Sequence, residues 1–304
     1  MPRPATSTIL GRVEVTPLAP QFPGDRNLLT GVRRALHDAD EAYLCVAFAS
    51  SSGVNLLRPS LEPIRHRAGA RLLVTTTFGT STPAALKHAH DLGVDIKVLN
   101  PTGGTFHPKV YAARSDDEVS LVVGSANLTA GLINNVEMAT FLRGEMREES
   151  IALIFEWARD IWRSSAATTW EPSGPVEEEA LSPELLALIT AAVDEDRVFR
   201  TLSQGKPNRV VEVTPQGLWV ETERSQAKGK PEGVPAWMIQ VAWDYLRAHG
   251  ELTNRFLLAN DGLNVKRSSF VCALLARLPG IEVMNKPMGV RLKSPSGPLR
   301  EPHG

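Results

Sequence analysis

Short apolar runs alternate with helical segments through the first 140 residues, and this alternation most limits what the chain can fold into. Apolar runs rich in β-branched residues, such as RLLVTTT at 71–77, predict buried strands. Pro83, with Ser81 or Thr82 before it as a cap, marks the start of a helix. Strands separated by helices favour an α/β fold, a mixed sheet with helices on its faces. The expected strands are 41–50, 71–77, 94–99, 109–113, 119–123 and 135–142, and the expected helices are 27–38, 83–92 and 148–163.

The chain changes character after residue 163, where a polar stretch with Pro172 and Pro175 predicts the end of a first domain. We expect a helix at 182–198 and a hairpin around 215–217. The composition of 224–233 is typical of a linker. The predicted division is a first domain at 1–163, a segment of open role at 164–233, and a smaller domain at 234–304.

The last segment is predicted to hold helices at 235–248, 253–259 and 266–278, followed by a hairpin at 281–292 that turns at Lys286-Pro287. Three helices and a hairpin are the layout of a winged helix-turn-helix domain, in which the third helix reads DNA. A small helical domain used for packing or for dimer contacts is the alternative. The candidate DNA contacts at the start of that third helix are Asn264, Lys266, Arg267, Ser268 and Ser269.

Charge is uneven along the chain, although its net value is only -1. Residues 201–304 hold 14 Lys and Arg against 9 Asp and Glu, a net of +5, and residues 1–200 have a net of -6. A basic C-terminal third suits a phosphate backbone, although ordinary scatter would also produce this difference.

Cys45 and Cys272 are too far apart to indicate a disulfide framework or a metal site, so we expect a reducing, cytoplasmic setting. No signal peptide and no apolar run of about 18–20 residues is visible, so no membrane role is expected.

The stretch from His107 to Glu137 contains the residues best suited to chemistry. Alternation along a strand would place His107 and Lys109 on one face, and a returning strand that ends at Gly124 would bring Ser125 and Asn127 to the same sheet end. The ammonium of Lys109 can bind a phosphate oxygen, and the neutral imidazole of His107 can attack phosphorus. A carboxylate such as Glu137 could hold the imidazole by its second nitrogen.

The spacing His107-x-Lys109 followed by Gly124-Ser125-x-Asn127 resembles the signature of the phospholipase D superfamily. The resemblance covers roughly residues 25–160 and implies a phospholipase D-like sheet. It also implies cleavage through a covalent phosphohistidine without a metal or cofactor. The usual signature has an aspartate at position 114, where this chain has Arg114. That departure, with Glu137 downstream, resembles metal-independent restriction endonucleases of this superfamily and favours a nuclease in a restriction or defence role.

The resemblance also implies a second histidine in the site, and His107 alone of the seven histidines is followed two residues later by lysine. Two chains would therefore have to meet with their His107 side chains in one site, which a two-fold homodimer achieves. We expect DNA as the substrate, with a larger defence complex as a possible further partner. Other phosphodiesters (phospholipid, RNA or a nucleotide) and a catalytically silent DNA-binding protein are the alternatives.

Overall fold

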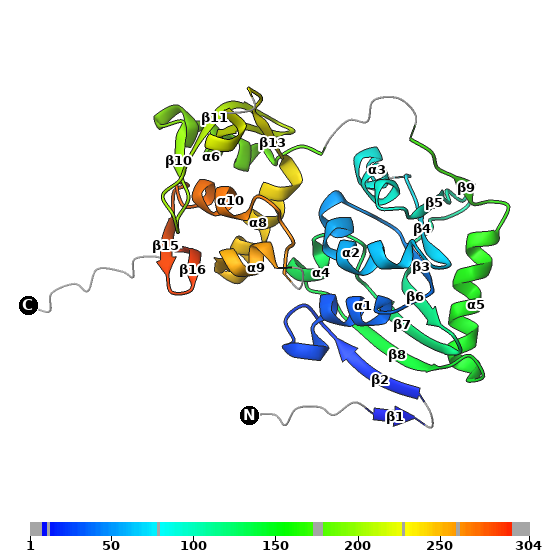
Figure 1. The fold of residues 1–304 in the computed structure, drawn as a ribbon. Helices are drawn as coiled ribbons and strands as arrows, with labels where there is room; N and C mark the ends of the chain where they lie inside the picture. Colours follow the sequence, from blue (N-terminus) through cyan, green and yellow to red (C-terminus); the bar gives the residue numbers. More distant parts are fainter. Residues whose placement is uncertain are drawn as a thin grey trace, which may run out of the picture. The chain divides into compact units, whose positions relative to one another are not determined.

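The computed structural model describes residues 8–10, 13–77, 80–172, 179–226, 229–259 and 262–293. The chain divides into two compact units, Met1–Glu179 and Ala180–Gly304, each with its own sheet and helices (Figure 1). The three-part division at 163 and 233 stays a prediction. Within the described residues, no helix is both long and apolar enough to cross a bilayer.

The described residues of the first unit form a nine-stranded mixed sheet in the order β1-β2-β8-β7-β6-β3-β4-β5-β9. Strands β3, β4 and β5 are parallel, and every other neighbouring pair in this described sheet is antiparallel. The expected mixed α/β sheet is confirmed. The strands are β1 (Thr8–Leu10), β2 (Val13–Leu18), β3 (Glu41–Val46), β4 (Gly69–Val74), β5 (Asp95–Val98), β6 (Lys109–Ser115), β7 (Glu118–Gly124), β8 (Ala139–Glu145) and β9 (Thr168–Thr169).

Helices cover both faces of this sheet, with α5 on one side and α1, α2 and α3 on the other (Figure 1). Alternate residues of β3 point to opposite faces, and Tyr43 and Cys45 join the core beneath α5. Phe155 on α5 is fully buried against Tyr43 with its ring centroid 5.7 Å away, which ties the helix to the sheet centre. The helices are α1 (Leu28–Leu36), α2 (Ser51–Ile64), α3 (Pro83–Asp91), the short α4 (Gly131–Asn134) and α5 (Glu149–Arg163), with a 3-10 turn η1 at Gly24–Arg26.

Three predicted helices of the first unit are confirmed within a few residues, as α1, α3 and α5. Helix α1 begins where Asn27 accepts a hydrogen bond from Thr30 N at 3.2 Å, and α3 begins after Thr82, which accepts from Ala85 N. Helix α2 was not predicted. Ser50 caps it by accepting from Gly53 N, and its buried Val54, Leu57, Leu61 and Ile64 recur at helical spacing.

The second unit begins with α6 (Pro183–Glu195) and a four-stranded antiparallel sheet among its described residues, in the order β10-β11-β12-β13. The strands are β10 (Val198–Arg200), β11 (Pro207–Thr214), β12 (Gly217–Thr222) and β13 (Glu232–Pro235), and the predicted hairpin is the pair β11–β12. The linker prediction for 224–233 is wrong. The short α7 (Glu223–Gln226) lies at its start and β13 begins at its end, where Gly233 pairs with Trp219 and the next residue, the buried Val234, pairs with Leu218.

The remainder of the second unit runs α8 (Ala236–His249), β14 (Glu251–Thr253), α9 (Asn254–Leu258), α10 (Ser268–Leu275), β15 (Ile281–Asn285) and β16 (Met288–Leu292). The three predicted helices and the final hairpin are therefore present, although α10 begins two residues later than expected. Strand β14 was not predicted. It pairs with β16 and completes a small antiparallel sheet in the order β14-β16-β15.

Candidate active site

The predicted catalytic residues meet at one edge of the nine-stranded sheet. Strand register aligns Val46 with Lys109, Val110 with Val123, and Gly124 with Ala139, so the ends of four neighbouring strands coincide there. His107 immediately precedes β6, Ser125 and Asn127 follow β7, and Glu137 precedes β8. The edge thus combines the carboxyl ends of β3 and β7 with the amino ends of β6 and β8.

His107 and Lys109 are in direct contact at this edge. The ammonium nitrogen of Lys109 lies 2.9 Å from Nδ1 and 3.2 Å from Nε2 of His107, and it donates to the His107 carbonyl oxygen at 3.0 Å. The imidazole is exposed, whereas Lys109 is only 8% exposed. A buried cation therefore lies beside an imidazole that solvent and a ligand can reach.

Burial of Lys109 removes water from its ammonium and lowers its pKa, while the negative charge of Glu137 acts in the opposite direction. Glu137 therefore helps to keep Lys109 charged, although no hydrogen bond is needed between them for that effect. A poorly hydrated ammonium binds an incoming anion at less desolvation cost than a surface lysine does. The arrangement suits a monoanionic phosphodiester.

Glu137 is held by Ser125 and Asn135 rather than by the imidazole. The Ser125 hydroxyl donates to one carboxylate oxygen of Glu137, and the Asn135 amide donates to the other at 3.1 Å. Met138 N in turn donates to the Ser125 hydroxyl at 3.1 Å. This network takes the place of the expected contact between Glu137 and the second imidazole nitrogen, since Glu137 lies in the segment between α4 and β8 and not on the strand itself.

Phe48 is a residue of this edge that the sequence did not indicate. Its backbone N–H donates to Oδ1 of Asn127 at 3.1 Å, and its ring lies 5.8 Å from the His107 ring in an edge-to-face arrangement. Because Oδ1 is taken by Phe48, the two N–H groups of the Asn127 amide face away from that bond. A ligand can therefore receive hydrogen bonds from Asn127.

Two glycines let the backbones of this edge approach closely. A Cβ on Gly53 would lie 2.1 Å from the Leu128 carbonyl oxygen, and a Cβ on Gly124 would lie 2.4 Å from the Met138 carbonyl oxygen. The first contact joins the start of α2 to the segment after Asn127. The second brings the end of β7 against the start of β8, which is where Ser125 and Glu137 meet.

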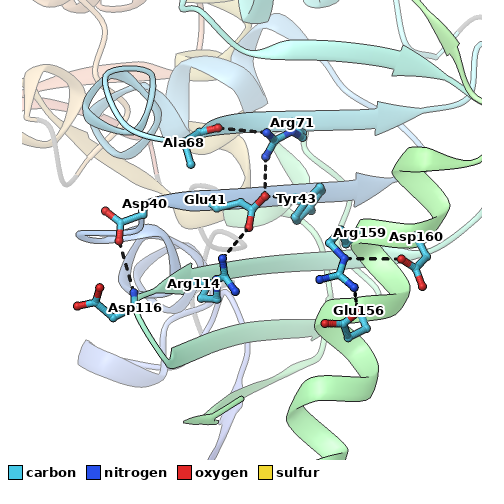
Figure 2. A network of polar contacts seen from close by, with 10 residues as sticks. All are labelled: Asp40, Glu41, Tyr43, Ala68, Arg71, Arg114, Asp116, Glu156, Arg159 and Asp160. Carbon is cyan, nitrogen blue, oxygen red and sulfur yellow. Dashed lines mark hydrogen bonds and ion pairs between the residues drawn. The ribbon is translucent and has the colours of Figure 1, made fainter. Parts of the chain in front are cut away.

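Arg114, at the position of the usual aspartate, lies at the opposite edge of the sheet. It pairs with Glu41 across β6 and β3 at 3.4 Å, and Glu41 also binds Arg71 at 3.0 Å (Figure 2). Five residues of extended strand, on the order of 16 Å, separate it from Lys109. Arg114 therefore stabilises the far edge and does not contact the predicted catalytic residues.

The predicted DNA contacts of the second unit are only partly accessible. Lys266 and Ser269 are exposed, and Arg267 is half-buried in an ion pair with Glu232 at 2.6 Å. Asn264 and Ser268 are 1% and 3% exposed, because the turn before α10 packs into the unit. Of these five predicted contacts, Lys266, Arg267 and Ser269 have side chains that solvent reaches.

Within the part of the chain that the structure describes, no three His, Cys, Asp or Glu side chains are grouped as metal ligands. No family model and no curated protein matches the chain. Solved structures do match. A phospholipase D family member is among the structures similar to this chain.

Three of these structures illustrate the likeness. Nuc from Salmonella typhimurium, a phospholipase D family member, is 17% identical over 52% of this chain and 97% of Nuc, with a TM-score of 0.39. NucT from Helicobacter pylori is 12% identical over 52% of this chain and 99% of NucT, with a TM-score of 0.40. Phosphatidylserine synthase from Haemophilus influenzae is 10% identical over 60% of this chain and 46% of that chain, with a TM-score of 0.39.

Proposed function

We propose that this chain is a metal-independent phosphodiesterase that cleaves DNA through a covalent phosphohistidine, in a site shared by two copies of the chain. The observation that carries the proposal is the contact between the Lys109 ammonium and both ring nitrogens of the exposed His107, at 2.9 and 3.2 Å. A phosphate oxygen can replace the imidazole as the partner of Lys109. The imidazole then lies beside the phosphorus with a free lone pair.

The reaction proceeds in two displacement steps. A ring nitrogen of His107 attacks phosphorus, so a P–N bond forms as the P–O bond to the leaving oxygen breaks. The leaving oxygen takes its proton from His107 of the second copy, acting as the imidazolium. Water, deprotonated by that same histidine, then displaces the first histidine and releases the phosphomonoester. Lys109 and Asn127 stabilise the charge on the non-bridging oxygens in both steps.

The order of elements from α8 to β16 supports DNA as the substrate. Helices α8, α9 and α10, strand β14 and the β15–β16 hairpin follow one another in the order of a winged helix-turn-helix domain. We propose α10 as the reading helix, with Ser269 in its first turn and Lys266 and Arg267 in the turn just before it as the DNA contacts. The positive charge of residues 201–304 adds a non-specific attraction to the phosphate backbone.

The test of the chemistry is plasmid cleavage in excess EDTA by the wild type, His107→Ala and His37→Ala. His37 is a matched control because its side chain is 76% exposed and it caps the end of α1. We expect cleavage that EDTA does not stop and that only His107→Ala abolishes. Cleavage that requires a metal, or that His107→Ala retains, would contradict the mechanism. Cleavage of bis(p-nitrophenyl) phosphate without cleavage of DNA would contradict only the choice of substrate.

The shared site has its own test. Mixing the wild type with excess His107→Ala chain, followed by exchange of subunits, places most wild-type chains in mixed dimers. Because each site needs two histidines, activity per wild-type chain should fall in proportion to the wild-type fraction. Activity per wild-type chain that stays constant on mixing would show that one chain is sufficient.

A further inference from the structure

We propose that Phe48 is the positioning residue of the active site, fixing the imidazole of His107 with its ring and the amide of Asn127 with its backbone. The expected effect of Phe48 on the rate of cleavage rests on the proposed function. The geometry stands without it, since Phe48 contacts both halves of the motif that the sequence places 20 residues apart.

The backbone around Phe48 is joined to both motif segments. Ala47 N donates to the carbonyl of Pro108, the residue between His107 and Lys109, at 3.1 Å. Leu128 N donates to the Phe48 carbonyl at 3.1 Å, directly after Asn127. The segment that extends β3 therefore contacts both halves of the site, and Phe48 belongs to this segment.

The polar contacts of His107 cannot hold the imidazole during the reaction. Lys109 must turn from the ring nitrogens to the phosphate oxygens when substrate binds, and the two ring nitrogens must become free to attack or to carry a proton. Glu137 is engaged by Ser125 and Asn135. The edge-to-face contact with Phe48, 5.8 Å between centroids and 79° between planes, requires neither ring nitrogen and neither charge.

The hydrogen bond from the Phe48 backbone N–H to Oδ1 of Asn127 fixes the orientation of the Asn127 amide rather than that of the imidazole. An asparagine amide has two orientations related by a flip, and only one presents N–H groups to an anion. Because Phe48 N–H occupies Oδ1, the donor side of the amide is the one left for the phosphate. The same residue thus orients a nucleophile and a donor, and the ring contribution can be tested alone by substitution.

The experiment compares Phe48→Leu, Phe48→Tyr and the control Phe22→Leu in the full chain. Phe22 is also half-buried, but its ring lies beside Arg26 at 5.4 Å and not beside His107. The substrates are plasmid DNA and bis(p-nitrophenyl) phosphate, both in EDTA. The small diester cannot stack a base on the ring, so it separates positioning from substrate binding.

We expect Phe48→Leu to lower kcat about tenfold or more on both substrates with KM nearly unchanged, since small misplacements of a reacting group are costly. Phe48→Tyr keeps an aromatic ring and should retain a kcat close to that of the wild type. Phe22→Leu should leave kcat unchanged. A rise in KM on DNA alone would overturn the proposal in favour of base stacking. An unchanged kcat, or a Tyr variant as slow as the Leu variant, would also overturn it.

A measurement that does not depend on cleavage separates this proposal from the proposed function. The ring of Phe48 should shift the carbon-bound proton resonances of the His107 imidazole, assigned by their loss in His107→Ala. This displacement of the His107 resonances by the aromatic ring should vanish in Phe48→Leu and persist in Phe48→Tyr. If the wild type proves inactive while the shifts behave in this way, the proposed function fails and the positioning contact stands. Identical imidazole shifts in the wild type and Phe48→Leu would overturn the contact itself.

Discussion

The hydroxyl of Ser125 donates a hydrogen bond to the carboxylate of Glu137, 12 residues further along the chain. The same hydroxyl accepts from Met138 N at 3.1 Å, so Ser125 joins the two ends of the connection between β7 and β8 as well as orienting the carboxylate. The two residues act as one unit at the edge of the sheet. Their effect on catalysis should pass through Lys109, whose pKa responds to the Glu137 charge.

Ser125→Ala should reduce kcat by about tenfold to a hundredfold, comparable to the loss of one orienting hydrogen bond in an active site. The reason is that the carboxylate loses a donor and the Met138 N–H loses its side-chain acceptor. Single-turnover cleavage of plasmid DNA measures the effect. Ser125→Thr keeps the hydroxyl and should retain most of the rate, and a Thr variant as slow as the Ala variant would contradict the role of the hydroxyl.

Glu137→Gln should move the alkaline limit of cleavage to lower pH. The carboxylate raises the pKa of Lys109 against the lowering caused by burial, so its removal lets that pKa fall further. The ammonium is then lost at a lower pH, and the rate falls first at the alkaline end of the pH profile. Cleavage rates of bis(p-nitrophenyl) phosphate between about pH 6 and 10 test this, and a limit that stays in place or moves upward would contradict it.

Arg114→Ala should leave cleavage within about twofold of the wild type and cost at most about 1 kcal/mol of unfolding free energy, because Arg114 is a partly exposed ion-pair partner far from the site. Urea unfolding and plasmid cleavage measure the two effects. Loss of cleavage in a folded Arg114→Ala chain would mean that the two edges of the sheet are coupled.

Lys266→Ala should weaken DNA binding and reduce the slope of log K against log salt by about 1, as expected for one lost phosphate contact. Fluorescence anisotropy with the full chain at several salt concentrations provides the slope. Lys206→Ala is the matched control, an exposed lysine of the same unit outside α8–β16. Equal salt-dependence slopes for Lys266→Ala and Lys206→Ala would contradict a phosphate contact by the turn before α10.

Acid should destabilise the first unit through His88. Burial lowers the pKa of His88 to about 4, against about 6.5 in an unfolded chain, so the unfolded state binds the extra proton between these values. The stabilising contribution is complete above about pH 6.5 and declines by roughly 1–3 kcal/mol as the pH falls toward 4. Thermal unfolding of His88→Gln should depend less on pH across that window, and a parallel dependence in both proteins would exclude His88 as the cause.

The sequence predicted the elements whose signals are local. Helix α3 has its cap and proline in sequence, and His107, Lys109, Ser125 and Asn127 have fixed spacing around two strands. Helix α2 was missed because Pro59 and Pro63 usually end a helix, yet burial of Leu57 and Leu61 maintains it here.

Contacts that join distant segments had no local signal. Phe48 reaches Asn127 across 79 positions, and only the pairing of β3 with β6 and the bridge from Ala49 to Leu128 bring them together. Strand β13 has only four residues and reads as a linker by composition, yet β12 pairs with it along its length. The orientation of Glu137 was also beyond the sequence, because it depends on where β8 begins.

The placement of Arg114 and Glu41 at the far edge bears on how related chains diverge. Glu41 pairs with Arg71 as well as with Arg114, so we expect the position of the usual aspartate to vary among related chains without disturbing the other edge. We expect less variation at the positions just outside the strands at the other edge, where the predicted catalytic residues lie. A search pattern that weights these strand ends and ignores the fifth residue after the lysine should recover distant homologues that the full signature overlooks.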